Sequence, residues 1–393
     1  MIKQNENSNT LILISLVFLI GYYFFPLISV LFLFVSMTTL NIRINYFYCF
    51  ILLVFSLAPY ISSKTGISYI GNDKAQYIDY IDNFTRGGFL EVIKFQPEVV
   101  SFGLLKILGA ISNTNVVFFV YFFVSFALLF SAIYLIDRNL LPLFFLIFFA
   151  SSYFLVLYGN VIRQGLALSF FLLSISQKGW KKYFLYTLAI FSHFSVLLFL
   201  IYLSLDNIKL KNKLVSICFL SFLAFFLSNL LLPMLSAVSV LGLNSFSHKA
   251  LLYIGWGDYD ISGSLMFVYG SLLLTCLLFF TENRFLTMNK LNSEIYQKLS
   301  NLLVFSFPLL IFLSSIPKIF ERFFLYVAVI DFLFIAYFLC SLKVANLKLL
   351  VCTIITPFLF FLGLKRFHDT AWYFNDNAHL FLETNLYNLL SNF

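Results

Sequence analysis

Arg163 and Gln164 stand on the first helical turn of a long apolar segment, directly after a turn over residues 159–160. An ionisable side chain at the edge of a membrane span costs free energy, so it is a candidate functional group. The structural alternative is an interfacial arginine that extends its charged end to water. Gly165 and Ser169 lie four residues apart, and such small side chains predict that another helix approaches this face closely.

Other polar residues fit chemistry on an anionic substrate. A second arginine, two carboxylates and a histidine lie near predicted membrane surfaces: Arg322, Asp73, Glu98 and His193. Guanidinium groups bind phosphate oxygens through two parallel hydrogen bonds, and a nearby carboxylate or imidazole can accept the proton of an attacking hydroxyl. Because there is no ATP outside the membrane, a lipid-linked diphosphate, which is already activated, is the natural donor for such a site.

Each of these residues also has a purely structural interpretation. Asp73 can solvate an outer amphipathic helix, and Glu98 can complement the dipole of the helix that it precedes. His193 can be a buried histidine with satisfied hydrogen bonds. Arg322 can form an interfacial ion pair with its neighbour Glu321. The sequence leaves these alternatives open.

The composition places the chain in a membrane. The 393 residues are 61% hydrophobic and only 11% charged, whereas soluble domains carry roughly a quarter charged residues. Repeated apolar runs of span length predict an all-α, polytopic integral membrane protein with about 10–12 membrane segments. The net charge of +8 is explained by the basic loops described below, so it does not indicate a nucleic-acid partner.

The apolar segments form a single transmembrane domain over residues 1–393. They are expected at 11–40, 45–62, 116–136, 140–158, 161–176, 183–205, 214–232, 265–280, 299–316, 323–342 and 349–364. Residues 11–40 are too long for one straight span and short for two, so a kinked helix and a tight hairpin both fit. Asp331 lies in the middle of a span, and the sequence identifies no partner for it.

Three polar stretches connect or follow the spans. Residues 63–102 are expected to form an outer loop with amphipathic helices, residues 233–263 a second outer loop, and residues 365–393 a polar tail. One helical face of the first loop carries Asp73, Tyr77, Ile81 and Phe84. Pro97 followed by Glu98 predicts a helix start, because proline suits the first position and an acid suits the first turn.

The distribution of charge predicts the topology. Loops rich in Lys and Arg stay in the cytoplasm, yet both flanks of residues 183–205 carry three lysines. Alternation of sides is restored if this segment is re-entrant, with Ser192, His193 and Ser195 near its tip. The inside loops then hold a large excess of basic residues, whereas the outside loops are balanced. Asp73, Glu98, Arg163 and Arg322 all fall on the outer side.

With these residues in place, the chain resembles the EpsG/Wzy type of polysaccharide polymerases, which assemble bacterial O-antigen and capsule. The matching stretches are GNDKAQYIDYI from Gly71, PE at Pro97 and Glu98, VIRQGLALSF from Val161, KKYFLYTLAIFSHFS from Lys181 and ERFFLYV from Glu321. The Arg-Gln-Gly-Leu-Ala core, followed by a basic loop and His-x-Ser, is the most specific element. Members of the family often read Glu-Pro where this chain reads Pro-Glu.

The resemblance implies a GT-C-like glycosyltransferase of the bacterial inner membrane, with its active site facing the periplasm. It would transfer a growing glycan from undecaprenyl diphosphate to a new lipid-linked repeat unit. In that interpretation Arg163 and Arg322, with Gln164, hold the diphosphate, and Glu98 takes the acceptor proton, with Asp73 and His193 as alternatives. No metal and no other cofactor are expected. The expected partners are the lipid-linked donor and acceptor, membrane lipid, a chain-length regulator and a flippase.

Two other function classes compete with this one. A flippase for lipid-linked oligosaccharides is a transporter, and such proteins usually show repeated halves, which this sequence lacks. A membrane O-acyltransferase would use a histidine such as His193 as a base in a membrane cavity. Accumulation of single-repeat surface glycan after deletion would favour the polymerase over both.

Overall fold

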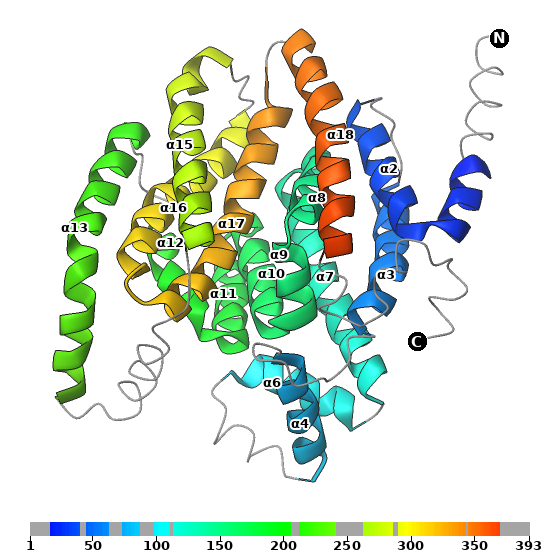
Figure 1. Cartoon of the computed structure of the whole chain (residues 1–393), viewed down its shortest axis with the longest axis horizontal. Helices are drawn as coiled ribbons and strands as arrows, with labels where there is room; N and C mark the ends of the chain where they lie inside the picture. Colours follow the sequence, from blue (N-terminus) through cyan, green and yellow to red (C-terminus); the bar gives the residue numbers. More distant parts are fainter. Residues whose placement is uncertain are drawn as a thin grey trace. The chain divides into compact units, whose positions relative to one another are not determined.

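The computed structural model describes residues 16–39, 45–62, 73–86, 98–110, 113–205, 212–240, 262–285, 290–342 and 345–369. The regular elements in these ranges are helices (Figure 1). Four of them are long and apolar enough to cross a membrane, and a fifth crossing is possible if one bent pair forms a single span. Four shorter apolar helices accompany them. The predicted all-α, polytopic membrane fold is confirmed, while the total of about 10–12 segments stays a prediction.

The helices gather into two compact units, which are described separately. Unit 1 comprises Met1–Phe194 and Leu349–Phe393, and unit 2 comprises Ser195–Lys348. That both units act as the predicted single domain over residues 1–393 stays a prediction.

Unit 1 contains the helices that hold most of the predicted site. In chain order they are α2 (Pro26–Thr39), α3 (Tyr46–Ser62), α4 (Asp73–Arg86), α6 (Val99–Gly109), α7 (Thr114–Asp137), α8 (Leu141–Ala150), α9 (Tyr153–Leu155), α10 (Ile162–Ser176), α11 (Trp180–Ser192) and, from Leu349 onward, α18 (Ala345–Asp369). A helix over residues 16–24 precedes α2, and Phe25 interrupts the helical conformation between the two. A Cβ atom on Gly21 would lie 3.0 Å from the Ser29 hydroxyl, so the two helices fold sharply against each other at this break.

The expected single span over residues 140–158 is wrong. The chain forms α8, then α9, and then a π-helical turn at Val156–Asn160. The first interruption follows from Ser151, which is extended and whose hydroxyl donates to the Phe148 carbonyl over 2.6 Å. Serine competes in this way with the backbone ladder of a helix. The segment Tyr153–Asn160 then meets α10 at an angle of 110°.

The amphipathic helix predicted from residue 73 is confirmed as α4. Tyr77 and Ile81 are buried, and they pack in one apolar cluster with Phe102 of α6, Tyr121 of α7 and Leu166 of α10. The side chain of Phe84 is not described. This cluster matters for function because it fixes α4 and α6 against the N-terminal turn of α10, where Arg163 lies.

The described part of unit 2 contains one short helix and several long ones that extend beyond the predicted apolar segments. They are α12 (Leu200–Leu205), α13 (Lys213–Val240), α15 (Ser262–Phe285), α16 (Lys290–Leu313) and α17 (Pro317–Cys340). The expected second outer loop, 233–263, therefore starts inside α13, which continues through Pro233. In unit 1, α18 likewise extends to Asp369, into the predicted tail. Residues 241–261 and 370–393 lie outside the described part.

Candidate active site

Glu98 is the residue around which the polar groups of unit 1 gather. It occupies the N-cap position of α6, yet its side chain makes no capping hydrogen bond there. One carboxylate oxygen, Oε2, forms an ion pair with Nη1 of Arg163. The other, Oε1, accepts a hydrogen bond of 3.3 Å from the Phe194 backbone N–H and lies 3.7 Å from Nε2 of His193. Glu98 therefore contacts a guanidinium, an amide and an imidazole.

Arg163 is held between aromatic groups. Its guanidinium carbon lies 4.7 Å from the centre of the Phe102 ring and 5.5 Å from that of Tyr77. Its Nε–H donates to the Tyr77 hydroxyl over 3.4 Å. Within the described residues, no acceptor is found for Nη2, and the side chain keeps 17% of its surface exposed. Aromatic rings on either side hold the guanidinium, and one of its edges is fixed to Glu98.

The Tyr77 hydroxyl supports this arrangement as a neutral group. Burial is the main cause that raises its pKa to about 12, although the charge of Arg163 acts in the opposite direction. The phenol therefore stays protonated at neutral pH, and its oxygen remains an acceptor for Arg163 without adding a negative charge to the site.

His193 lies at a break in the chain, as predicted. It follows α11 with extended backbone angles, φ −161° and ψ 124°, and a 3₁₀ segment starts at Phe194. The break is fixed by a hydrogen-bond chain: the Ser101 hydroxyl donates to the Ser192 carbonyl over 2.8 Å, and the Tyr121 hydroxyl donates to Ser101 over 3.1 Å. Glu98 and Ser101 thus both tie α6 to the end of α11. That the segment returns to the side from which it entered stays a prediction.

Gly165 sets the position of the first turn of α10. A Cβ atom on it would lie 2.6 Å from the Leu157 carbonyl oxygen, which is backbone and cannot move aside cheaply. One turn further on, the Ser169 and Tyr158 hydroxyls hydrogen-bond over 2.8 Å. The predicted close approach at Gly165 and Ser169 is confirmed, and the partner is the segment that ends in the π-helical turn. π-Helical turns are frequent at functional sites.

Gln164, which follows Arg163 in the first turn of α10, has a buried side chain without a hydrogen-bond partner among the described residues. It is 1% exposed, and neither its side-chain oxygen nor its nitrogen has a partner among the described residues. The rings of Phe171 and Tyr186 lie 6.0 Å apart and join α10 to the antiparallel α11. Gln164 precedes Phe171 by seven residues, and His193 follows Tyr186 by seven, which is about 10 Å along each helix. Gln164 and His193 therefore lie at the same level.

Two predicted site residues remain, Asp73 of unit 1 and Arg322 of unit 2. The charge of Asp73 acts on the Tyr77 hydroxyl, so Asp73 lies near the cluster around Arg163. Asp73 begins α4, and its backbone N–H donates to Oδ1 of Asn160 over 3.0 Å. Arg322 belongs to unit 2 and lies in the second turn of α17. Its neighbour Glu321 forms an ion pair of 3.2 Å with Lys318. That Arg163 and Arg322 converge on one diphosphate stays a prediction. Among the described residues, no cluster of three or more His, Cys, Asp and Glu suits a metal ion.

The interpretation of the sequence missed several groups that shape the site. Phe102, Ser101, Tyr121 and Asn160 were not selected, and Tyr77 was recognised only as a member of an amphipathic face. Phe102 follows Glu98 by four residues, a spacing that puts both on one side of a helix. That spacing is a signal available in the sequence, whereas the contacts of Tyr121 and Asn160 depend on the fold.

Three comparisons with known proteins bear on the identity of the chain. No curated protein and no solved structure gives a significant match. The sequence profile of the EpsG family matches residues 47–377, a range that includes Glu98, Arg163, His193 and Arg322. The match extends over most of the chain, so this protein belongs to the EpsG family and has the general character of a polysaccharide polymerase of that family.

Proposed function

We propose that the protein is a glycosyltransferase that lengthens a polysaccharide at the outer face of the bacterial inner membrane. It joins oligosaccharide repeat units linked to undecaprenyl diphosphate, as in O-antigen or capsule synthesis. The observation that carries this proposal is the contact of Glu98 with both Arg163 and His193, because it unites a candidate base with a candidate anion site.

The reaction needs one bond to form while another breaks. A hydroxyl of the acceptor sugar attacks the anomeric carbon of the donor glycan, and the bond from that carbon to the diphosphate oxygen breaks. The diphosphate leaves with the electron pair, and the hydroxyl proton passes to the Glu98 carboxylate, with His193 or Asp73 as alternative acceptors. Transition-state charge thus appears on the diphosphate oxygens, which a guanidinium stabilises.

The ion pair between Glu98 and Arg163 couples these two events. When Glu98 takes up a proton it loses its negative charge and holds the guanidinium less strongly. At the same moment the leaving diphosphate gains negative charge next to Arg163. Arg163 can therefore exchange one anionic partner for another without a large movement, and its Nη2 already lacks an acceptor in the described part of the site. Gln164 and Arg322 supply further donors in this proposal.

Deletion of the gene, followed by analysis of surface glycan, tests the proposal. We expect the polysaccharide ladder to collapse to a single repeat unit, and wild-type protein to restore it. Surface polymer of normal length that lacks an acyl group would instead indicate an O-acyltransferase. Repeat units that stay on their lipid carrier inside the cell would indicate a flippase. Either result would contradict the polymerase assignment.

A further inference from the structure

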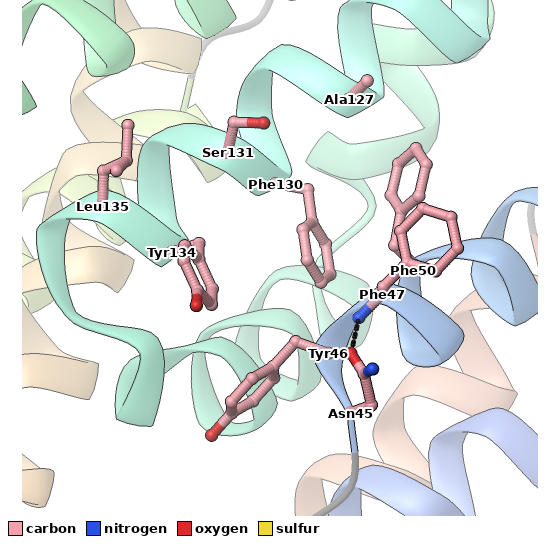
Figure 2. A pocket seen from close by; sticks show the side chains of 9 residues that line it. All are labelled: Asn45, Tyr46, Phe47, Phe50, Ala127, Phe130, Ser131, Tyr134 and Leu135. Atoms are coloured by element: carbon pink, nitrogen blue, oxygen red, sulfur yellow. Dashed lines mark hydrogen bonds between the residues drawn. The ribbon is translucent and has the colours of Figure 1, made fainter.

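A groove lies between α3 and α7 of unit 1, away from the candidate active site. Its volume is about 480 Å³, and its lining residues are Asn45, Tyr46, Phe47, Phe50, Ala127, Phe130, Ser131, Tyr134 and Leu135. Figure 2 shows the Tyr46 and Tyr134 rings at one end, the Phe47 and Phe50 rings at the other, and the Phe130 ring between them. The groove is therefore apolar along its length and carries hydroxyl groups at one end.

The surface around the groove suits a bilayer. Phe47, Tyr48 and Leu135 are each more than half exposed, and they belong to apolar helices of a membrane protein. Aromatic and aliphatic side chains that face hydrocarbon need no further cover. The groove thus opens towards lipid chains, and a hydrocarbon chain fits its walls.

The tyrosine end of the groove collects hydrogen-bond donors that lack acceptors. In the described part of the chain, no hydrogen bond is found for the Tyr46 and Tyr134 hydroxyls, for Nδ2 of Asn45, or for the exposed guanidinium of Arg138. Arg138 directly follows α7 and is close enough for its charge to act on the Tyr46 hydroxyl. The neighbouring Asp137 accepts through Oδ1 from the backbone and side-chain N–H groups of Asn139 over 2.9 and 3.0 Å. Its charge acts on the Tyr46 hydroxyl in the direction opposite to that of Arg138.

These donors and the Arg138 guanidinium, which have no protein acceptor among the described residues, suit a ligand that only accepts. An ionised phosphate is such a group, and charge-assisted hydrogen bonds from arginine to phosphate are the strong ones. Basic sites between membrane helices on the cytoplasmic side are known to bind lipid head groups. The charge pattern of the sequence predicts this end of α7 to be cytoplasmic.

We propose that this groove binds one anionic diacyl phospholipid. Its phosphate lies among Arg138, Tyr46 and Tyr134, and one acyl chain lies over Phe130 and Phe50. The proposal does not depend on the function of the candidate active site.

The lipid-linked substrate of the proposed reaction is a poorer occupant. Tyr121, beside the active site, and Asp137, beside the groove mouth, are 16 residues apart on α7, or about 24 Å along the helix. A polyisoprenyl diphosphate bound at Arg163 would present its tail, and not its phosphates, to the groove end. The donors at Tyr46, Tyr134 and Arg138 would then stay unpaired.

Thermal melting of the purified full-length protein in mild detergent tests this site. Phosphatidylglycerol is titrated into the protein, and phosphatidylcholine with the same acyl chains and undecaprenyl phosphate are titrated in parallel. We expect a saturable rise in Tm with phosphatidylglycerol at the lowest concentration of the three. Arg138→Gln should weaken the apparent affinity for phosphatidylglycerol about tenfold, and Tyr46→Phe or Tyr134→Phe about threefold.

Two further variants separate this site from general effects. Lys181→Gln removes one exposed positive charge from the start of α11, on the same predicted side, and should leave the affinity unchanged. Ala127→Phe fills the groove and should abolish saturable binding while the protein still melts cooperatively without lipid.

Three results would overturn the proposal. Equal losses from Arg138→Gln and Lys181→Gln would indicate general electrostatic attraction. Tighter, Arg138-dependent binding of undecaprenyl phosphate would assign the groove to an isoprenoid carrier. A change from dimer to monomer on Ala127→Phe would assign it to a second copy of the chain.

Discussion

Among the described residues, Glu98 of unit 1 and Asp331 of unit 2 are carboxyl groups buried among helices, and their partners differ. Glu98 in unit 1 contacts a guanidinium, an imidazole and a backbone N–H. Asp331 in unit 2 is 1% exposed and is bound by hydroxyls only, from Thr275 over 3.2 Å and from Ser271. Its Oδ2 has no partner among the described residues. The same chemical group thus has two different surroundings, a cation and an imidazole in one unit and hydroxyl groups in the other.

The difference between the partners of Glu98 and Asp331 indicates how the role of a buried acidic residue in a membrane protein can be inferred. Intramembrane acids are functional candidates by default. Hydroxyl groups on α15, however, connect Asp331 to a neighbouring helix, and such interhelical hydrogen bonds stabilise membrane bundles by roughly 1 kcal/mol. Glu98 instead lies at the end of a helix, beside a break in the chain, with a cation and a second titratable group. We therefore expect chemistry at Glu98 and helix packing at Asp331.

The largest effect is expected from Glu98→Gln. The amide keeps the shape of the carboxylate but is a poor base, and general-base catalysis contributes roughly 10²–10⁴-fold. Polymer formation should fall by a factor in that range, while Asp73→Asn should be milder. Gel analysis of glycan length measures the loss of polymer, and an immunoblot quantifies the protein in the membrane. Normal-length polymer at wild-type protein level would remove Glu98 from the mechanism.

Arg163→Lys tests the cationic partner that distinguishes Glu98 from Asp331. Lysine keeps the charge but loses the planar fork that stacks on Phe102 and binds two oxygens at once. Loss of a charged hydrogen bond made chiefly in the transition state should lower the rate roughly 100-fold. Arg322→Lys should behave alike if it binds the same diphosphate.

The control for the arginine variants is Arg366→Lys, at the end of α18, which should leave the glycan ladder unchanged. If Arg163→Lys makes full-length polymer while Arg163→Ala misfolds, Arg163 is a structural anchor. The diphosphate site would then have to be sought elsewhere.

A smaller effect is expected from Tyr121→Phe. The variant removes the donor to Ser101 and so loosens the link that holds Ser192 and His193 in place. One buried neutral hydrogen bond is worth about 1 kcal/mol, so activity should fall about fivefold. Ser101→Ala should add little in the double variant, because both changes break one network. The exposed Tyr183→Phe serves as control, and full additivity would show that the two hydroxyls act independently.

The smallest effect on activity is expected from Asp331→Asn. Asparagine keeps an acceptor oxygen for Thr275, so the contact between α15 and α17 persists. Polymer length should stay within about twofold of wild type, since an interhelical hydrogen bond in a membrane contributes only roughly 1 kcal/mol to stability. The same gels and a Tm measurement test this. Loss of polymer at a normal protein level would make Asp331 a second functional acid. The roles of Glu98 in chemistry and of Asp331 in helix packing would then no longer be separate.

Local signals predicted a large part of this structure. The start of α10 before Arg163, the buried face of α4 and the break at His193 follow from turn residues, helical periodicity and the paired basic flanks. Long-range contacts did not follow. Glu98 and Arg163 are 65 residues apart. Of the aromatic rings around Arg163, Phe102 lies on the helix that Glu98 precedes and Tyr77 comes from a further helix, α4. The π-helical turn at Val156–Asn160 was missed because an apolar run looks the same in either helix type.

The order of the two units along the chain has a consequence for biosynthesis. Unit 2 is an insertion within unit 1, which is completed only by residues from Leu349 onward. In α18, a Cβ atom on Gly363 would lie 3.6 Å from the backbone of Ala150 in α8, so the last helix that the structure describes packs against one made much earlier. Domains generally fold as the ribosome releases them, N-terminal parts first. Unit 1 must therefore wait in the bilayer, unfinished, while all of unit 2 is translated.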